Sequence, residues 1–187
     1  SSPRLALTPA QSAEALRRIQ SDPEFFVHRG LAGPPRWAGQ IDILNSVRDN
    51  PETLVISGHG LGKTAVFADV AIWFMYAYAP AKVITLAPTG RQVESLLWSE
   101  IRRQRRRVGL GGFVGNSAPE MRTGDDHFAK GFTAAAGESF QGRHYRYMMF
   151  AFDESVGISP IFWETTRSMF RAGGETVSSI GPGLLLF

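Results

Sequence analysis

Short apolar runs alternate with longer helical patterns through the middle of the chain. Four runs have the length of strands in a buried sheet: residues 53–56, 82–87, 128–135 and 146–152. Two longer segments, 63–78 and 91–107, have the length of helices. Strands that alternate with helices predict an α/β fold, with a mostly parallel sheet and helices on both faces.

The N-terminal part predicts a helical lead-in. Thr8 is suited to cap a helix, Pro9 to its first position and Gln11 to the partner position of a capping box, so we expect a helix that ends near Asp22-Pro23. A Gly- and Pro-rich connector follows. We therefore expect a lead-in over residues 1–35 and a core domain over 36–187.

Two further segments complete the pattern. Residues 37–47 predict a helix with Ile41, Leu44 and Val47 on one face. Residues 109–126 are polar and glycine-rich, which is typical of a loop or an irregular hairpin.

Composition narrows the class of protein. The 187 residues carry a formal charge of only +3, which by itself does not indicate a nucleic-acid binder. There is no cysteine, and the four histidines are scattered, so a structural metal site is not expected. No apolar stretch is long enough to span a membrane and the first residues lack the plan of a signal peptide, so we expect an intracellular protein.

The segment Ser57-Gly58-His59-Gly60-Leu61-Gly62-Lys63-Thr64 joins a predicted strand to a predicted helix. Backbone N–H groups in such a turn can surround phosphate oxygens, and the N-terminus of the helix adds positive potential. Lys63 would contact the β- and γ-phosphates, and the Thr64 hydroxyl would bind Mg²⁺. The alternative is a glycine-rich turn that only caps a core helix.

Two carboxylates follow the last predicted strand. In Met148-Met149-Phe150-Ala151-Phe152-Asp153-Glu154 they stand at the carboxyl edge of the sheet, where ligands of open α/β sheets bind. Asp153 would hold the Mg²⁺ shell and Glu154 would orient the attacking water. Alone, such a pair is commonly a solvated strand end, but a phosphate-binding turn upstream favours a catalytic site.

Two other features leave their alternatives open. Gln40 could pair with a donor and an acceptor of adenine, or it could be a surface glutamine on a helix. Arg91, Gln92 and the cluster Arg102–Arg107, in which five of six residues are arginine, could contact DNA phosphates or the nucleotide of a neighbouring subunit. The cluster could equally be the solvated, dipole-complementing end of a helix.

These motifs, in their order, resemble the large subunits of tailed-bacteriophage terminases over roughly residues 35–170. The segments that carry the resemblance are Trp37 with Gln40, residues 57–64, Ala87-Pro88-Thr89 with Arg91-Gln92, Ser139-Phe140-Gln141-Gly142, residues 152–155, Ile158 and Trp163-Glu164. The resemblance implies a P-loop NTPase of the RecA or additional-strand type.

The resemblance also implies roles and partners. It makes Gln40 the adenine reader, Lys63 and Thr64 the phosphate and Mg²⁺ ligands, Asp153 the second Mg²⁺ contact and Glu154 the catalytic carboxylate. The implied cofactors are ATP and Mg²⁺. The implied partners are double-stranded DNA, a small terminase subunit, a portal protein and further copies of the chain in a ring. Its place would be the host cytoplasm, transiently on a procapsid.

The sequence departs from the family pattern in three ways. Ser57 replaces the usual leading glycine. His59 stands near the place where some members carry an arginine that acts on the γ-phosphate, so we expect an arginine finger from a neighbouring subunit, with Arg102, Arg143 and Arg146 as candidates. No segment matches the RNase H-like nuclease, and no nuclease activity is expected of these residues.

Two other functions compete with a packaging ATPase. A helicase-like translocase on nucleic acid would use the same P-loop and acidic pair. A non-catalytic nucleotide- or DNA-binding module is disfavoured by the complete set Lys63, Thr64, Asp153 and Glu154, because such a module does not need all four.

Overall fold

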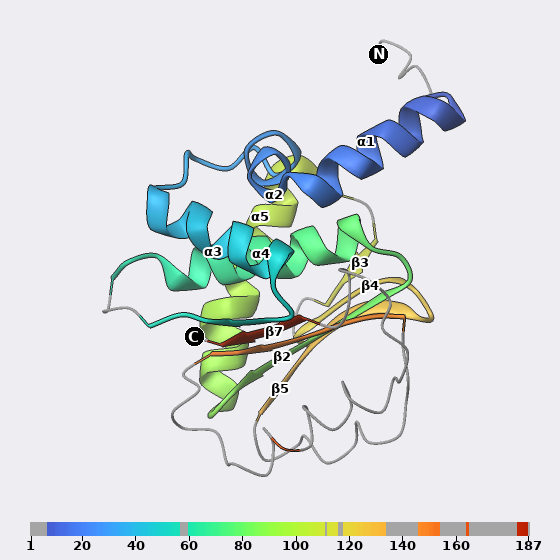
Figure 1. Cartoon of the computed structure of the whole chain (residues 1–187). Helices are drawn as coiled ribbons and strands as arrows, with labels where there is room; N and C mark the ends of the chain where they lie inside the picture. Colours follow the sequence, from blue (N-terminus) through green and yellow to red (C-terminus); the bar gives the residue numbers. More distant parts are fainter. Residues whose placement is uncertain are drawn as a thin grey trace.

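A parallel sheet with one antiparallel edge forms the centre of the computed structural model (Figure 1). The structure describes residues 7–56, 60–110, 112–115, 118–133, 146–153, 164 and 183–186. Its strands are β1 Glu52–Leu54, β2 Ala81–Ala87, β3 Phe113–Val114, β4 Glu120–Gly124, β5 His127–Thr133, β6 Tyr147–Phe152 and β7 Gly183–Leu186. They lie in the order β1-β7-β6-β2-β5-β4-β3. The first five of these are parallel, and β4 and β3 are antiparallel, which confirms the predicted α/β class.

Helices α1 to α4 lie on one face of this sheet (Figure 1). The helical elements are α1 Pro9–Ser21, α2 Pro23–Phe25, the π-helical turn η1 Phe26–Gly30, α3 Ala38–Asp49, α4 Lys63–Ala77, the π-helical segment η2 Gln92–Leu97 and α5 Trp98–Val108. Segment η2 runs directly into α5. The first residue of α5, Trp98, lies on the same face of the sheet as α4, where its indole N–H donates to the Thr85 hydroxyl of β2 at 3.0 Å. None of these helices among the described residues is long and apolar enough to cross a membrane.

Helix α4 is the centre of the hydrophobic core. Every residue from Val66 to Met75 is buried, so the helix is covered on every side. This burial is typical of a helix whose apolar residues occupy all of its faces. The sheet covers it below through Val83 and Met149, which belong to the same core. Helices α1 and α3 contact it from the other side.

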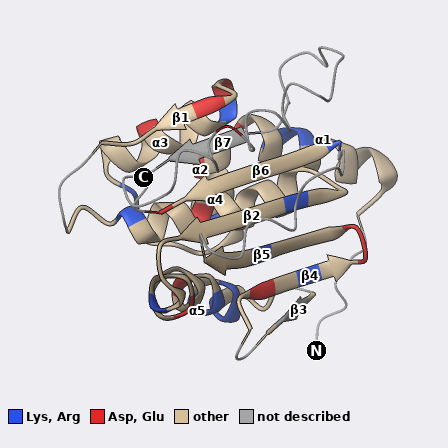
Figure 2. Cartoon of the chain, turned by 90° about the horizontal axis from the view of Figure 1, so that it is seen from below, with Lys and Arg blue, Asp and Glu red and all other residues tan. Residues whose placement is uncertain are grey.

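The second face of the sheet is buried as well. Side chains of successive strand residues point to opposite faces, so Ile84 and Leu86 of β2 and Phe150 and Phe152 of β6 face away from α4. All four are at most 3% exposed. Figure 2 views the sheet from this side, with helices α1 to α4 behind it. A strand buried on both faces explains why β2 and β6 read as continuous apolar runs rather than alternating ones.

The lead-in is fastened to α4. Helix α1 starts with the predicted capping box, in which Thr8 and Gln11 bond each other's backbone N–H groups. The Trp73 indole N–H donates to the Ile19 carbonyl at 2.7 Å, and the Gln20 amide donates to the Ala77 carbonyl at 2.7 Å. Residues Phe26, Val27 and Leu31 belong to the same core as α4. The described part of the predicted lead-in, residues 7–35, therefore packs against α4 through these contacts.

The antiparallel pair β3–β4 confirms the hairpin alternative for residues 109–126. Other details differ from the sequence expectations, and strand β1 ends at Leu54 rather than at Ile56. The short elements α2 and η1 were not expected. Nor was β7, which is formed by Gly183–Leu186 and lies between β1 and β6 in the sheet.

Candidate functional site

The start of helix α4 has the geometry of an anion-binding turn. Gly60 and Gly62 adopt positive φ angles of 81° and 76°, which glycine accepts without strain, and Gly62 is the N-cap of the helix. Lys63 and Thr64 open the helix, and its first turn contains no acidic residue. The N–H groups of that turn and the helix dipole favour a bound anion here. Ser57, Gly58 and His59 lie outside the described residues.

The acidic strand end lies at the same edge of the sheet. Leu54 of β1 pairs with Leu186 of β7, and Leu186 pairs with Phe152 of β6, so these three strands end side by side. Asp153 follows Phe152 directly, and its backbone N–H donates to the Leu86 carbonyl at 2.9 Å. Strands β1 and β6 are two strand spacings apart, about 10 Å. One strand, β7, therefore separates β1, which precedes the glycine turn, from the acidic strand. Glu154 lies outside the described residues.

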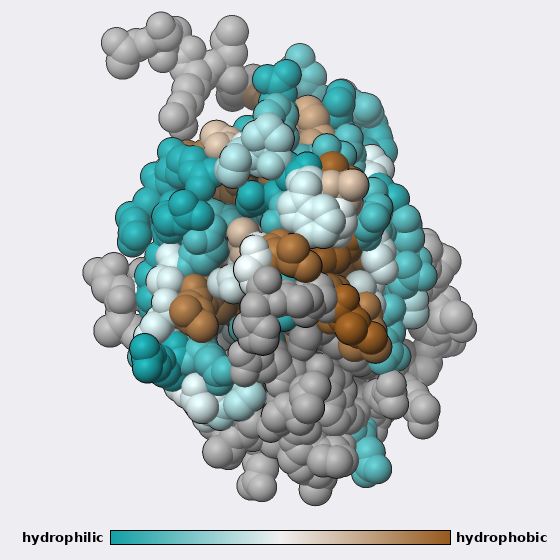
Figure 3. Space-filling view, turned by 90° about the vertical axis from the view of Figure 1, so that its left-hand side faces the viewer, coloured by the Kyte–Doolittle hydropathy of each residue, from teal (hydrophilic) through white to brown (hydrophobic). Residues whose placement is uncertain are grey.

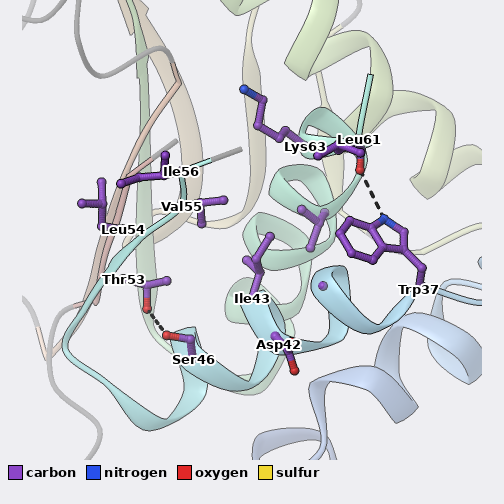
Figure 4. Close-up of a pocket in the computed structure, with 12 residues that line it drawn as sticks. Trp37, Asp42, Ile43, Ser46, Thr53, Leu54, Val55, Ile56, Leu61 and Lys63 are labelled. Carbon is purple, nitrogen blue, oxygen red and sulfur yellow. Dashed lines mark hydrogen bonds between the residues drawn. The ribbon is translucent and has the colours of Figure 1, made fainter. Parts of the chain in front are cut away.

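A pocket of about 320 Å³ opens beside this turn (Figure 4). Its lining residues come from α3, from β1 and the residues after it, and from the start of α4: Trp37, Gly39, Asp42, Ile43, Ser46, Thr53, Leu54, Val55, Ile56, Leu61, Lys63 and Val66. Trp37, Leu54, Ile56 and Leu61 are 45–88% exposed, and Figure 3, which views this edge, shows apolar surface near its centre. An apolar pocket with a lysine on its wall suits a ligand that has a flat apolar part and an anionic part.

Two side chains from the start of α3 hold the glycine turn. The Trp37 indole N–H donates to the Leu61 carbonyl at 3.3 Å, and the Gln40 amide donates to the Gly62 carbonyl at 3.2 Å. Gln40 is 6% exposed and is not among the pocket's lining residues. The residue expected to read adenine is thus buried against the glycine turn in the structure.

A buried ion pair joins the segment before α3 to α4. Arg36 donates to both carboxylate oxygens of Asp69 on α4, at 2.6 and 2.9 Å, and Asp69 is fully buried. Burial raises the pKa of Asp69, and hydrogen bonds from Arg36 and Gln104 oppose that shift. The Gln104 amide of α5 also donates to the Ala65 carbonyl in the first turn of α4. The segment before Trp37 is therefore tied to the helix that carries Lys63.

The arginine cluster of α5 mostly binds the chain's own carbonyl groups. Arg102 donates to the Gly115 and Ala118 carbonyls at 2.8 and 3.0 Å. Arg105, which is 3% exposed, donates to the Leu110 carbonyl at 2.8 Å. Arg107 donates to the Ala32 carbonyl, and Arg103 forms an ion pair with Glu100 on its own helix. These contacts fasten the β3–β4 hairpin and the N-terminal connector to α5, which is a structural use of the charge.

The other candidate residues are dispersed. Arg146 lies before the first residue of β6, at the edge of the sheet opposite Lys63, with its guanidinium 5.2 Å from the centre of the Tyr147 ring. Arg143 lies outside the described residues, as do residues 139–142. Thr89 and Gln92 stand at the start of the helical run formed by η2 and α5. The side chain of each accepts a hydrogen bond from the backbone N–H of the other, so this part of the Ala-Pro-Thr-x-x-Gln segment forms a capping box. Sequence reasoning missed that role, although the same spacing was recognised at Thr8 and Gln11.

Comparisons with known proteins bear on the fold. No protein-family model and no curated protein matches the sequence. The large terminase of bacteriophage HK97 superposes with a TM-score of 0.64 at 12% identity, over 91% of this chain and 37% of that protein. The chain shares its fold with part of a bacteriophage large terminase.

A second solved structure, the Phi-28 gp11 DNA packaging motor, matches over 81% of this chain and 49% of that protein, with a TM-score of 0.46 and 15% identity. That similarity is too weak to carry an argument. The terminase-like fold agrees with the resemblance drawn from the motifs. Among the described residues, no group of three or more His, Cys, Asp or Glu side chains could hold a metal ion.

Proposed function

We propose that the chain is the ATP-hydrolysing motor domain of a viral DNA-packaging enzyme of the terminase kind, which couples hydrolysis to movement of duplex DNA into a procapsid. The observation that carries this proposal is the shared edge of the sheet: the turn Gly60–Thr64 opens α4 where β6 ends in Asp153. The fold that the chain shares with part of the HK97 large terminase supports it.

The residues present fit a triphosphate with a divalent cation. Lys63 contacts the β- and γ-phosphate oxygens, and the N–H groups at the start of α4 surround the phosphates. Thr64 would bind Mg²⁺ through its hydroxyl, and Asp153 would hold the ion's shell from the end of β6. Bound there, the ion would supply neutralisation of charge on the phosphate oxygens. In the sequence Glu154 follows Asp153, and we assign it the orientation of the attacking water.

A neighbouring copy of the chain completes the site. An arginine supplied in trans stabilises the charge that develops on the γ-phosphate. The Arg102 guanidinium already binds two carbonyl groups of its own chain, so Arg143 and Arg146 are the better candidates. The assembled enzyme is a homo-oligomeric ring in the host cytoplasm, and its partners are double-stranded DNA, a small subunit and the portal of the procapsid.

Steady-state ATP hydrolysis by Lys63→Ala tests the proposal. The variant is expected to lose activity by a factor on the order of 10²–10³, the cost of removing one group that stabilises developing charge. The matched control is Arg29→Ala, which removes the same charge from an exposed position outside the site. Equal activity of Lys63→Ala and Arg29→Ala would show that the glycine turn is not the phosphate site.

A further inference from the structure

The surroundings of Gln40 assign it a role that its position in the sequence does not reveal. We infer that Gln40 is a positioning residue for the phosphate turn rather than a reader of adenine, and this inference rests on the proposed function. The site then selects the triphosphate and accepts different bases in the apolar pocket beside Trp37. The inference starts from which face of α3 carries each side chain.

Helix α3 uses two faces for two purposes. Gly39, Ile43 and Ser46 line the pocket beside Lys63. Gln40 and Leu44 lie on the buried face, one helical turn apart, at 6% and 0% exposure. A side chain on the buried face has no access to a base that occupies the pocket. Its amide instead meets the Gly62 carbonyl.

The two hydrogen bonds from α3, together with the bond from the Val66 N–H to the Gly62 carbonyl at 3.3 Å, fix the direction of two backbone N–H groups. In a trans peptide the C=O and N–H bonds point in opposite directions. Trp37 holds the Leu61 carbonyl and Gln40 holds the Gly62 carbonyl, so the N–H groups of Gly62 and Lys63 point away from α3. Those are donors that an anion at the start of α4 would use.

Close packing supports this bracing role. A Cβ at Gly62 would lie 2.6 Å from the Gln40 amide nitrogen, so a side chain there would displace the amide, and the positive φ also favours glycine. A Cβ at Gly39 would overlap the Trp37 ring, so the first turn of α3 also needs glycine for the ring to lie on it. Helix α3 and the glycine turn thus each contain a glycine that leaves room for a side chain that holds the turn.

The described lining of the pocket offers little that could distinguish bases. Ser46 and Thr53 hydrogen-bond to each other at 2.9 Å, and the Asp42 carboxylate points away from Trp37 and Lys63 (Figure 4). The remaining walls are apolar. Stacking of a base on an aromatic ring such as Trp37 tolerates every base, because each has a π-face.

Calorimetric titration of the full chain tests the inference with four ligands in Mg²⁺: tripolyphosphate, ATP, GTP and CTP. We expect the wild-type protein to bind the three nucleotides within about tenfold of one another, since stacking supplies only a modest preference. We expect Gln40→Met to weaken all four ligands by a common factor of about 3–10, the value of one neutral hydrogen bond. Tripolyphosphate is the decisive ligand because it has no base.

Gln20→Met is the matched control. It removes the same kind of bond, from a glutamine amide to a carbonyl of α4, but at the far end of the helix, at Ala77. We expect it to leave all four affinities unchanged. If Gln40→Met weakened ATP alone, or if the wild type bound ATP far more tightly than GTP and CTP, Gln40 would be a base reader and the inference would be wrong. If the wild type bound neither tripolyphosphate nor any nucleotide, the proposed function itself would fail.

Discussion

The two ends of the sheet use positive charge in opposite ways. At the β1 end a single lysine, Lys63, opens a helix whose first turn has no acidic residue. At the β3 end, the arginine-rich helix α5 directs Arg102 and Arg105 to backbone carbonyls of the hairpin segment. The arginines at the end with more basic residues thus bind backbone carbonyls of their own chain. The number of basic residues is a poorer guide to a ligand site than the backbone that surrounds them.

Arg36–Asp69 is the only described ion pair in which both side chains are at most 9% exposed. Arg36→Leu should therefore lower the free energy of unfolding by about 3–5 kcal/mol at neutral pH, because it leaves a buried carboxylate uncompensated. Burial already raises the pKa of Asp69, and loss of Arg36 raises it further. A carboxyl group with a raised folded-state pKa adds stability that is present below its unfolded pKa and lost as pH rises through the folded value. The loss should therefore be larger at pH 8 than at pH 5.

Urea denaturation followed by circular dichroism at both pH values measures this effect. Arg17→Leu is the control, because it breaks the pair with Glu14, whose side chains are 67% and 72% exposed. We expect that change to cost less than about 1 kcal/mol. Equal losses from the two variants would mean that the buried pair adds no more stability than an exposed one.

Removing the negative charge of one carboxylate at each end of the sheet compares the two ends a second time. Asp153→Asn should reduce ATP turnover by a factor on the order of 10², because it removes a group that holds the catalytic cation. Raising the Mg²⁺ concentration should restore part of the activity. Asp125→Asn makes the same change at an exposed turn of the hairpin end and should leave turnover unaltered. Turnover of Asp153→Asn at the wild-type rate would remove Asp153 from the site.

Arg105 tests the structural use of charge at the hairpin end. Arg105→Met should lower the free energy of unfolding by about 1–3 kcal/mol, because the Leu110 carbonyl loses its donor and a buried side chain changes. Turnover per folded molecule should not change. Chemical denaturation and ATP hydrolysis of the same preparation measure both quantities. A fall in turnover without a fall in stability would assign Arg105 to the active site instead.

Arg102 should show the smallest effect. Arg102→Met should cost about 1 kcal/mol of stability and leave turnover within twofold at high protein concentration. An arginine finger, by contrast, is worth a factor of about 10³ or more. A loss of that size, rescued by mixing with Lys63→Ala protein, would identify Arg102 as the finger and reverse the comparison.

The sequence predicted the parts of the fold that local patterns encode. The capping box at Thr8 and Gln11 and the buried strands β2 and β6 are local signals. Strand β7 is a run of three leucines far along the chain, and nothing local indicates that it inserts between β1 and β6.

The candidate site was predictable to a similar extent. The glycine turn and the acidic strand end are defined by short segments, and parallel strands bring them to one edge. The role of Gln40 depends on which face of α3 is buried. The sequence predicted Ile41 on the buried face, whereas the structure buries Gln40 there. The partners of the arginines are loop carbonyls that approach α5 only in the folded chain, so charge alone could not show them.

A crystal structure of the chain with Mg²⁺ and a non-hydrolysable ATP analogue tests the central claim most directly. The account predicts Lys63 on the β- and γ-phosphates, Thr64 and Asp153 around the ion, and the base beside Trp37 with Gln40 still bonded to the Gly62 carbonyl. A nucleotide bound elsewhere, with Lys63 and Asp153 both out of contact with it, would contradict it.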